Sequence, residues 1–164
     1  LQGWKGINID VVQKSVTSIA NFRVRDTSIC CAFRDYNGET EYFIGKNSTG
    51  ESSISEDWGA GAKRKITIPC RTLNSILEEH LPQGRHIDFL SIDVEGAEGL
   101  VIQGMKKLLE KNNIRLLIEC SEIGRNDTWK ILKKLNYKCF RKDNLKKEIT
   151  SFNNYRNNDF LWIK

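Results

Sequence analysis

The chain has 164 residues, of which 39% are hydrophobic and 29% are charged, and its formal net charge is +5 at pH 7. This composition is typical of one soluble globular domain over residues 1–164, and no apolar run approaches the roughly 18 residues of a membrane-spanning helix. From Lys130 onward there are ten Lys or Arg and three Asp or Glu. Sparse aromatic residues and the absence of a nucleic-acid-binding motif favour a solvated basic surface over a nucleic-acid partner.

The N-terminal third alternates short apolar runs with turns. A β-branched run at residues 6–10 predicts a strand, and the apolar spacing over 12–22 predicts a helix. The apolar run 27–33 suits a buried strand. Turn chemistry at Asn37 and Gly38, followed by alternation, predicts a hairpin-like excursion. The Gly-, Ser- and acid-rich segment 46–63 is expected to be a loop that can act as a flap.

The rest of the chain alternates strands and helices. We expect strands at 64–69, 87–93, 114–120, 137–140 and 159–164, with a basic loop before the last one. Helices are expected at 73–81, with Thr72 or a neighbour as its cap, and at 97–112 and 127–136. Such alternation predicts an α/β fold built from βαβ units, with a mostly parallel sheet covered by helices.

The cysteines are five in number and form neither a CxxC pair nor a Cys/His cluster with zinc spacing. They are Cys30, Cys31, Cys70, Cys120 and Cys139. We therefore expect reduced, mostly buried thiols, a cytoplasmic setting and no metal site. The N-terminus has no signal-peptide pattern and resembles the middle of a longer protein.

Acidic residues end three of the predicted strands. Asp10 ends the first, Asp93 and Glu95 follow 87–92, and Glu119 and Glu122 follow the strand that begins at 114. In open α/β sheets, ligands bind outside the carboxyl ends of the strands. The sequence therefore predicts a ligand site at this edge.

Each acidic position also has a purely structural interpretation. Asp10 is suited to hold the two hydroxyls of a ribose, but an acid after a strand is as often a helix N-cap. In the stretch "DVEG", Asp93 could cap the next helix while Glu95 and Glu98 occupy its first turn, where the helix dipole favours negative charge. Both interpretations remain open at the level of residue pattern.

Five stretches, taken in order, resemble the FkbM family of S-adenosylmethionine-dependent methyltransferases. They are "GWKGINID", "RTLNSIL", "IDFLSIDVEGAEGLVIQGM", "IRLLIEC" and "NNDFLWIK". The similarity runs along essentially the whole chain. It implies a Rossmann-like class I methyltransferase fold with strand order 3-2-1-4-5-7-6, mostly parallel with an antiparallel last strand. It also implies O-methylation of a hydroxyl on a sugar, glycan or polyketide-type metabolite.

The resemblance assigns roles to particular residues. Asp10 would bind the ribose of S-adenosylmethionine, and the stretch Cys31, Ala32, Phe33 and Arg34 would lie beside the adenine. Asp93 and Glu95 would line the pocket where donor and acceptor meet, and Glu119 would lie near the acceptor. The family's first strand and its Gly-containing loop would precede Leu1, so we expect a partial domain that lacks its central strand.

Methyl transfer to an ordinary alcohol needs aligned reactants and a base. His80 and His86 are badly placed, so Asp93 is the first candidate for the base and Glu95 the second. If a divalent metal assists, the same carboxylates would be its ligands, although no spacing requires one. The rival interpretation is a non-catalytic remnant or binding module. An NAD-dependent oxidoreductase is weaker because no GxGxxG is present.

Overall fold

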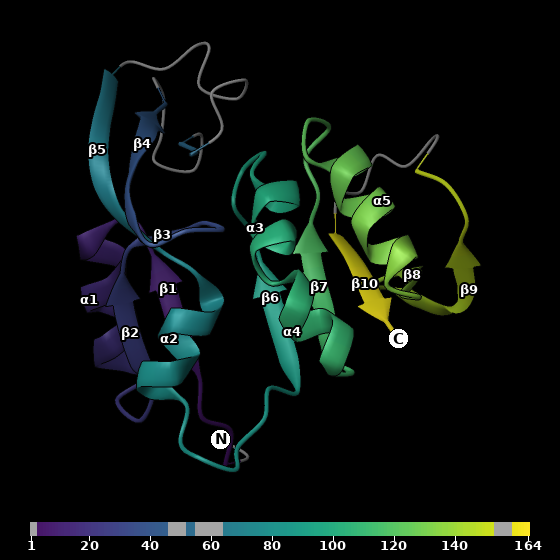
Figure 1. The fold of residues 1–164 in the computed structure, drawn as a ribbon, viewed down its shortest axis with the longest axis horizontal. Coiled ribbons are helices and arrows are strands. Elements are labelled where there is room, and N and C mark those ends of the chain that lie inside the picture. Colours follow the sequence, from purple (N-terminus) through teal and green to yellow (C-terminus); the bar gives the residue numbers. More distant parts are fainter. Residues whose placement is uncertain (1–2, 46–51, 55–63, 153–158) are drawn as a thin grey trace.

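The fold combines strands and helices, as Figure 1 shows for a computed structural model. The structure describes residues 3–45, 52–54, 64–152 and 159–164. The described strands are β1 (Ile7–Asp10), β2 (Thr27–Cys30), β3 (Ala32–Phe33), β4 (Gly38–Ile44), β5 (Arg64–Arg71), β6 (Phe89–Ile92), β7 (Arg115–Glu119), β8 (Lys138–Arg141), β9 (Asn144–Ile149) and β10 (Asp159–Ile163). The described helices are α1 (Gln13–Phe22), α2 (Leu73–His80), α3 (Glu98–Gly104), α4 (Lys106–Lys111) and α5 (Arg125–Lys134). The prediction of a mixed α/β protein is confirmed.

The described strands form three sheets. In one, β1 lies parallel to β2, and in the largest the order is β6-β7-β10-β8-β9. The third has the order β3-β5-β4. Among the described strands, β1 pairs only with β2, and β6 pairs only with β7. β1 and β6 point the same way in Figure 1. Each of these two strands therefore has one edge that no described strand occupies.

The pairing is more antiparallel than we expected. As expected, β6 and β7 are parallel and the last strand, β10, runs antiparallel to both β7 and β8. In addition, β4 runs antiparallel to β5, which was not expected. The predicted basic loop contains β9, which forms an antiparallel pair with β8. The short turn between β8 and β9 permits only this direction, because parallel neighbours need a crossover of a dozen or more residues.

Local boundaries also differ from the predictions. The predicted strand 27–33 divides at Cys31 into β2 and β3, which belong to different sheets. The Cys31 backbone N–H donates a hydrogen bond to the Asp10 carbonyl at 3.1 Å. The expected hairpin at Asn37 does not form with the preceding strand, because β4 pairs with β5. The helix predicted over 97–112 is divided into α3 and α4 at Met105. Of the expected flap, only 52–54 are described.

The first turn of α2 is capped as predicted. Thr72 is the N-cap residue, and its hydroxyl oxygen accepts a hydrogen bond from the Ser75 backbone N–H at 3.2 Å. This bond satisfies one of the four backbone donors that begin every helix. The start of α2 was therefore readable from residue chemistry alone.

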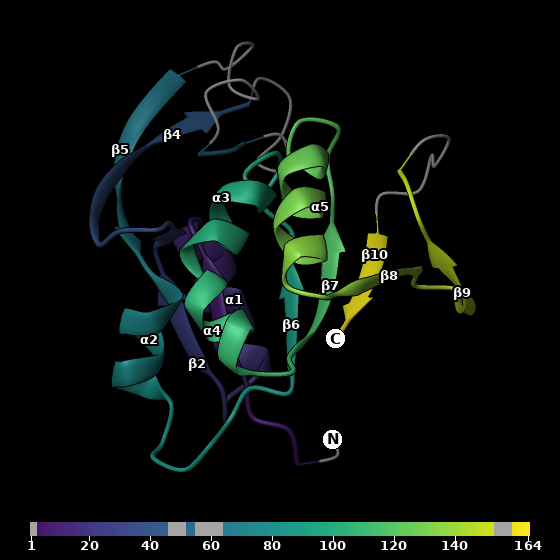
Figure 2. The same cartoon turned by 45° about the vertical axis from the view of Figure 1, so that its right-hand side comes forward.

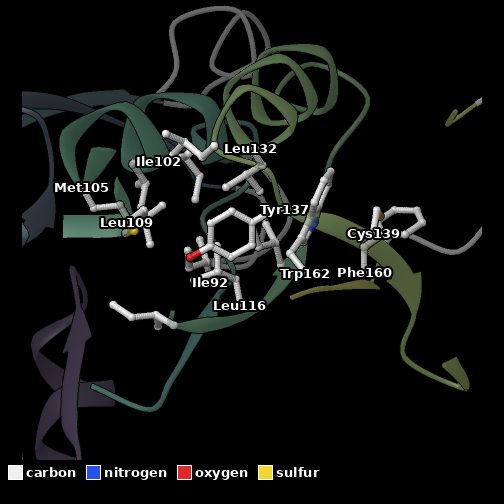
Figure 3. Packing of buried hydrophobic residues seen from close by; sticks show 14 of the residues in the cluster. Ile92, Ile102, Met105, Leu109, Leu116, Leu132, Tyr137, Cys139, Phe160 and Trp162 are labelled. Carbon is white, nitrogen blue, oxygen red and sulfur yellow. The ribbon is translucent and has the colours of Figure 1, made fainter. Parts of the chain in front are cut away.

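The main hydrophobic core lies between the five-stranded sheet and the helices α3, α4 and α5, which cover one of its faces (Figures 1 and 2). One hydrophobic cluster joins the helices to the sheet (Figure 3). It contains Ile102, Leu109 and Leu132 from the three helices and Leu116 and Trp162 from the sheet. All five are fully buried. Burial of this apolar surface holds α3 against the sheet and so places the loop that precedes α3.

The cysteines are all free thiols, four of them buried and Cys30 partly buried, as predicted. Burial raises the pKa of the Cys120 thiol above its ordinary value, so this group stays protonated at neutral pH. In the described part of the chain, no helix is long and apolar enough to cross a membrane.

Candidate functional site

A cavity of about 280 Å³ lies where the carboxyl ends of β1 and β6 face the three-stranded sheet. Its described lining consists of Ile9, Asp10, Val11, Val12, Ser15, Cys31, Ala32, Phe33, Tyr42, Ser52, Ser53, Ile54, Asp93, Val94 and Glu95. The volume is near the lower end of the range of roughly 300–1,000 Å³ that is usual for small-molecule sites. Six of the predicted site residues, at positions 10, 31–33, 93 and 95, thus line one cavity although they come from three separate parts of the chain.

Asp10 is the last residue of β1 and lines this cavity. Its Oδ1 accepts a hydrogen bond from the Val12 backbone N–H at 2.8 Å. The N-cap residue of α1 is Val12, whose side chain makes no capping bond. Asp10 therefore closes a short turn before α1 and leaves Oδ2 outside that bond, so the carboxylate can serve the turn and a ligand together.

The segment after β2 provides an apolar wall. Cys31 and Ala32 are buried, Phe33 is half-buried, and all three line the cavity. Arg34 does not belong to the lining. Its guanidinium instead lies over the Tyr36 ring, 5.2 Å from the ring centroid. The structure thus separates Arg34 from the other three residues of the predicted stretch.

The loop between β6 and α3 carries Asp93 and Glu95 into the cavity wall. Glu95 has φ 45° and Gly96 has φ 87°, so two consecutive residues adopt left-handed conformations. The N-cap residue of α3 is Ala97, without a side-chain capping bond. The interpretation in which Asp93 caps this helix is therefore wrong. A non-glycine residue in this conformation costs of order 1–3 kcal/mol, and such strained conformations cluster at functional sites.

The cavity wall formed by Tyr42 and segment 52–54, across from Asp10 and Asp93, was not predicted from the sequence. Segment 52–54 is held to β4 by two hydrogen bonds, from the Phe43 N–H to the Ser53 carbonyl at 2.8 Å and from the Ser53 N–H to the Phe43 carbonyl at 3.0 Å. The neighbouring Ser52 hydroxyl accepts from the Gly45 N–H at 3.0 Å. Tyr42 alternates with its neighbours in β4, but nothing in the local pattern indicated which surface its side chain meets.

Tyr42 is a hydrogen-bonding group of this wall. Burial raises the pKa of its phenol, a hydrogen bond with the Ser52 side chain opposes that shift, and the carboxylates of Asp10 and Glu95 raise the pKa further. The phenol is therefore protonated at neutral pH and can donate a hydrogen bond into the cavity.

Glu119 ends β7 and lies outside the cavity lining. It pairs across the sheet with Asp159, whose carboxylate forms an ion pair with Lys142. The pKa of Glu119 is raised, first by loss of hydration and then by the carboxylates of Asp93 and Asp159. Glu119 is thus electrostatically coupled to Asp93, although the two do not line the cavity together.

We expect the Glu119→Gln substitution to stabilise the fold slightly at pH 7, by about 0.5 kcal/mol or less because the side chain is exposed. A carboxyl whose pKa is raised by folding is disfavoured in its charged form, so the charge costs stability above the folded pKa. The gain should vanish as the pH falls below the ordinary glutamate pKa of 4.5. Thermal melts at several pH values test this, and a gain that persists at acidic pH would contradict it.

The described lining contains three carboxylates, those of Asp10, Asp93 and Glu95, and no Lys, Arg or His. This charge balance favours a ligand that carries positive charge or hydroxyl donors over an anionic one. Among the described residues, no group of three or more His, Cys, Asp or Glu is arranged to hold a metal ion.

Comparison with known protein families gave a match over most of the chain. The family described as the methyltransferase FkbM domain matches residues 1–154 of this chain. No curated protein and no solved structure was found to match.

Proposed function

Because the chain belongs to the FkbM methyltransferase family, we propose that it transfers a methyl group from S-adenosylmethionine to a hydroxyl of a sugar, glycan or secondary metabolite. The observation that carries this proposal is the single cavity that collects Asp10, the apolar segment Cys31–Phe33 and the Asp93–Glu95 loop. These three parts offer a ribose acceptor, an apolar surface and carboxylates in one place.

The lining suits S-adenosylmethionine in charge and polarity. When bound, this cofactor supplies an electrophilic methyl group on a positively charged sulfonium. Asp10 would accept hydrogen bonds from the ribose hydroxyls, and Ala32 and Phe33 would contact the adenine. The acidic lining would favour the sulfonium by simple charge attraction.

Asp93 is the proposed general base, and Glu95 is the second candidate. The acceptor hydroxyl must lose its proton as it attacks, and a carboxylate at the cavity wall can take that proton. Asp93 is exposed and directly follows the buried residue Ile92, so the strand restricts its backbone. Glu119 is the more remote candidate because it lies outside the lining.

Asp10 allows a direct test of cofactor binding. We expect Asp10→Ala to weaken S-adenosylmethionine binding by about 1.5–3 kcal/mol, the usual contribution of a hydrogen bond to a charged group. Asp10→Asn is the matched control, because an amide oxygen can still accept from the Val12 N–H while the charge is lost. Calorimetry should show the larger loss for alanine. Unchanged affinity in Asp10→Ala with the fold intact would remove Asp10 from the site.

The rival function is a non-catalytic binding module with the same fold. A screen of the complete protein with S-adenosylmethionine and hydroxyl acceptors separates the two functions. Methylated product that depends on Asp93 supports the enzyme. Cofactor or glycan binding without any methyl transfer supports the binding module.

We also propose that β1 and β6 belong to one Rossmann-like sheet, joined by a parallel strand from polypeptide outside residues 1–164. The order β6-β7-β10-β8 supports this, because it corresponds to the 4-5-7-6 part of the strand order implied by the family resemblance. The unoccupied edges of β1 and β6 support it as well, since a row of unpaired backbone N–H and C=O groups at a sheet edge is a template for pairing with a further strand.

The proposed strand predicts a difference in stability. Residues 1–164 expressed alone should be poorly soluble or melt with low cooperativity, because the facing edges of β1 and β6 lack a partner among the described strands. An N-terminal extension that supplies the strand should raise the melting temperature and sharpen the transition. Calorimetry of both versions tests this. A sharp melt at high temperature for residues 1–164 alone would contradict the prediction.

The remaining parts of the proposal concern setting and partners. A small molecule or glycan is the proposed acceptor, without a nucleic-acid partner. We place the protein in the cytoplasm because its five cysteines are free thiols, as expected in a reducing compartment.

A further inference from the structure

Glu98 is the most deeply buried carboxylate near the cavity, with 1% of its surface exposed. It is the first residue of α3 and does not belong to the cavity lining. Burying a carboxylate is costly unless its oxygens are hydrogen-bonded, so the contacts of Glu98 require a physical explanation.

Its two oxygens accept three hydrogen bonds from two different loops. Oε1 accepts from the Gly96 N–H at 3.0 Å and from the Ser121 N–H at 3.3 Å, and Oε2 accepts from the Ser121 hydroxyl at 3.1 Å. Gly96 belongs to the loop after β6, and Ser121 belongs to the loop after β7. Glu98 thus connects the two loops that follow the parallel neighbours β6 and β7.

The bond to Gly96 acts at the most constrained point of the β6–α3 loop. Glu95 and Gly96 have φ values of 45° and 87°, and the Glu98 carboxylate binds the N–H of the peptide that joins them. Surroundings must hold a left-handed non-glycine residue in place, because its conformation is intrinsically unfavourable. Glu98 supplies such a contact immediately beside the cavity-lining residue Glu95.

The second loop is shaped to receive the same carboxylate. The Ser121 hydroxyl oxygen accepts from the Gly124 N–H at 3.1 Å. A Cβ placed on Gly124 would lie only 2.9 Å from the Glu98 Cδ. The glycine therefore leaves the space that the Glu98 side chain occupies, and the carboxylate is held from both sides.

We propose that Glu98 is a positioning residue of the site. It holds the Asp93–Glu95 loop in its ligand-binding conformation through the Gly96 peptide, without touching the methyl donor or acceptor. This role rests on the proposed function, because it takes the cavity lined by Asp93 and Glu95 to be the S-adenosylmethionine site.

The test compares Glu98→Gln with Glu98→Ala in the complete protein. The glutamine carbonyl can accept from the Gly96 and Ser121 N–H groups, and its amide can donate to the Ser121 hydroxyl, so this variant should retain the contacts. Alanine removes all of them. Leu132→Ala is the matched control, because it destabilises the core on α5 without touching either loop.

S-adenosylmethionine affinity is measured by calorimetry at a temperature where every variant is folded, with hydrogen exchange at Gly96 and Ser121 as the second readout. We expect Glu98→Ala to weaken binding at least about 10-fold and to speed exchange at both amides. Glu98→Gln and Leu132→Ala should stay within about 3-fold of the wild-type affinity.

The outcomes separate the two proposals. Unchanged affinity in Glu98→Ala, or an equal loss in Leu132→Ala, would reduce Glu98 to a stability role and overturn the inference alone. A loss of affinity in Glu98→Gln as large as in Glu98→Ala would overturn it as well, because binding would then depend on the charge of Glu98 and not on its hydrogen bonds. A wild-type protein that does not bind S-adenosylmethionine would refute the proposed function and with it the role that depends on it.

Discussion

Asp93→Asn is expected to lower kcat by about 10²–10⁴-fold, the usual contribution of a positioned general base. The amide has nearly the same shape as the carboxylate but cannot take a proton from the acceptor hydroxyl. Asp93 is exposed at the end of β6 and caps no helix, so the substitution should cost little stability. Steady-state methyl transfer to a hydroxyl acceptor, with a thermal melt of the same variant, measures both effects.

Two further variants serve as comparisons. Glu95→Gln should lower kcat less, because Glu95 lies farther from the strand end. Glu122→Gln should leave kcat unchanged, because this exposed acid follows β7 and is not part of the cavity lining. Full activity in Asp93→Asn would exclude Asp93 as the base and leave Glu95 or Glu119 as candidates.

The largest effect on stability is expected from Gly124→Ala. Gly124 has φ −78° and ψ −15°, a conformation that alanine adopts without strain. The added methyl group would, however, collide with the Glu98 carboxylate, with the Cδ only 2.9 Å away. The three hydrogen bonds of Glu98 would have to break, and disrupting a buried charged network costs about 3–5 kcal/mol. Chemical denaturation of the variant measures this loss.

A double-mutant cycle isolates the cause of that loss. In the Glu98→Ala background the collision is absent, so Gly124→Ala should be neutral or stabilise the fold by about 0.4–1 kcal/mol, through a less flexible unfolded chain. The same substitution thus changes the sign of its effect with the residue at 98. Equal destabilisation in both backgrounds would show that Gly124 is required for a reason other than the Glu98 side chain.

Much of the secondary structure could be predicted from short-range patterns. The strands β6, β7 and β10 and the helix α5 follow apolar periodicity, and the start of α2 follows the preference of threonine for N-caps. Strand β9 was missed and predicted as a loop because local patterns do not mark it. Its sequence is mostly polar, so its strand conformation depends on pairing with β8.

The predicted site residues differ in how the fold uses them. Asp10, Asp93 and Glu95 line one cavity because the acidic ends of β1 and β6 face each other, and strand ends were readable from the sequence. Arg34 and Glu119 lie outside the lining, because the direction of a side chain beyond a strand end is set by its neighbours. For Arg34, one such neighbour is the Tyr36 ring.

The sequence by itself determined the α/β class, the acidic strand ends and the membership in a methyltransferase family, because each of these depends on the type and spacing of nearby residues. Tertiary structure alone decided that Tyr42 and Ser52 form the opposite wall of the cavity and that Glu98 is buried between two loops. These features depend on how separate segments pack together, as when Glu98 contacts Ser121 in the loop after β7. Local periodicity carries no information about such contacts, because it reports which face of an element is apolar and not which distant surface covers it.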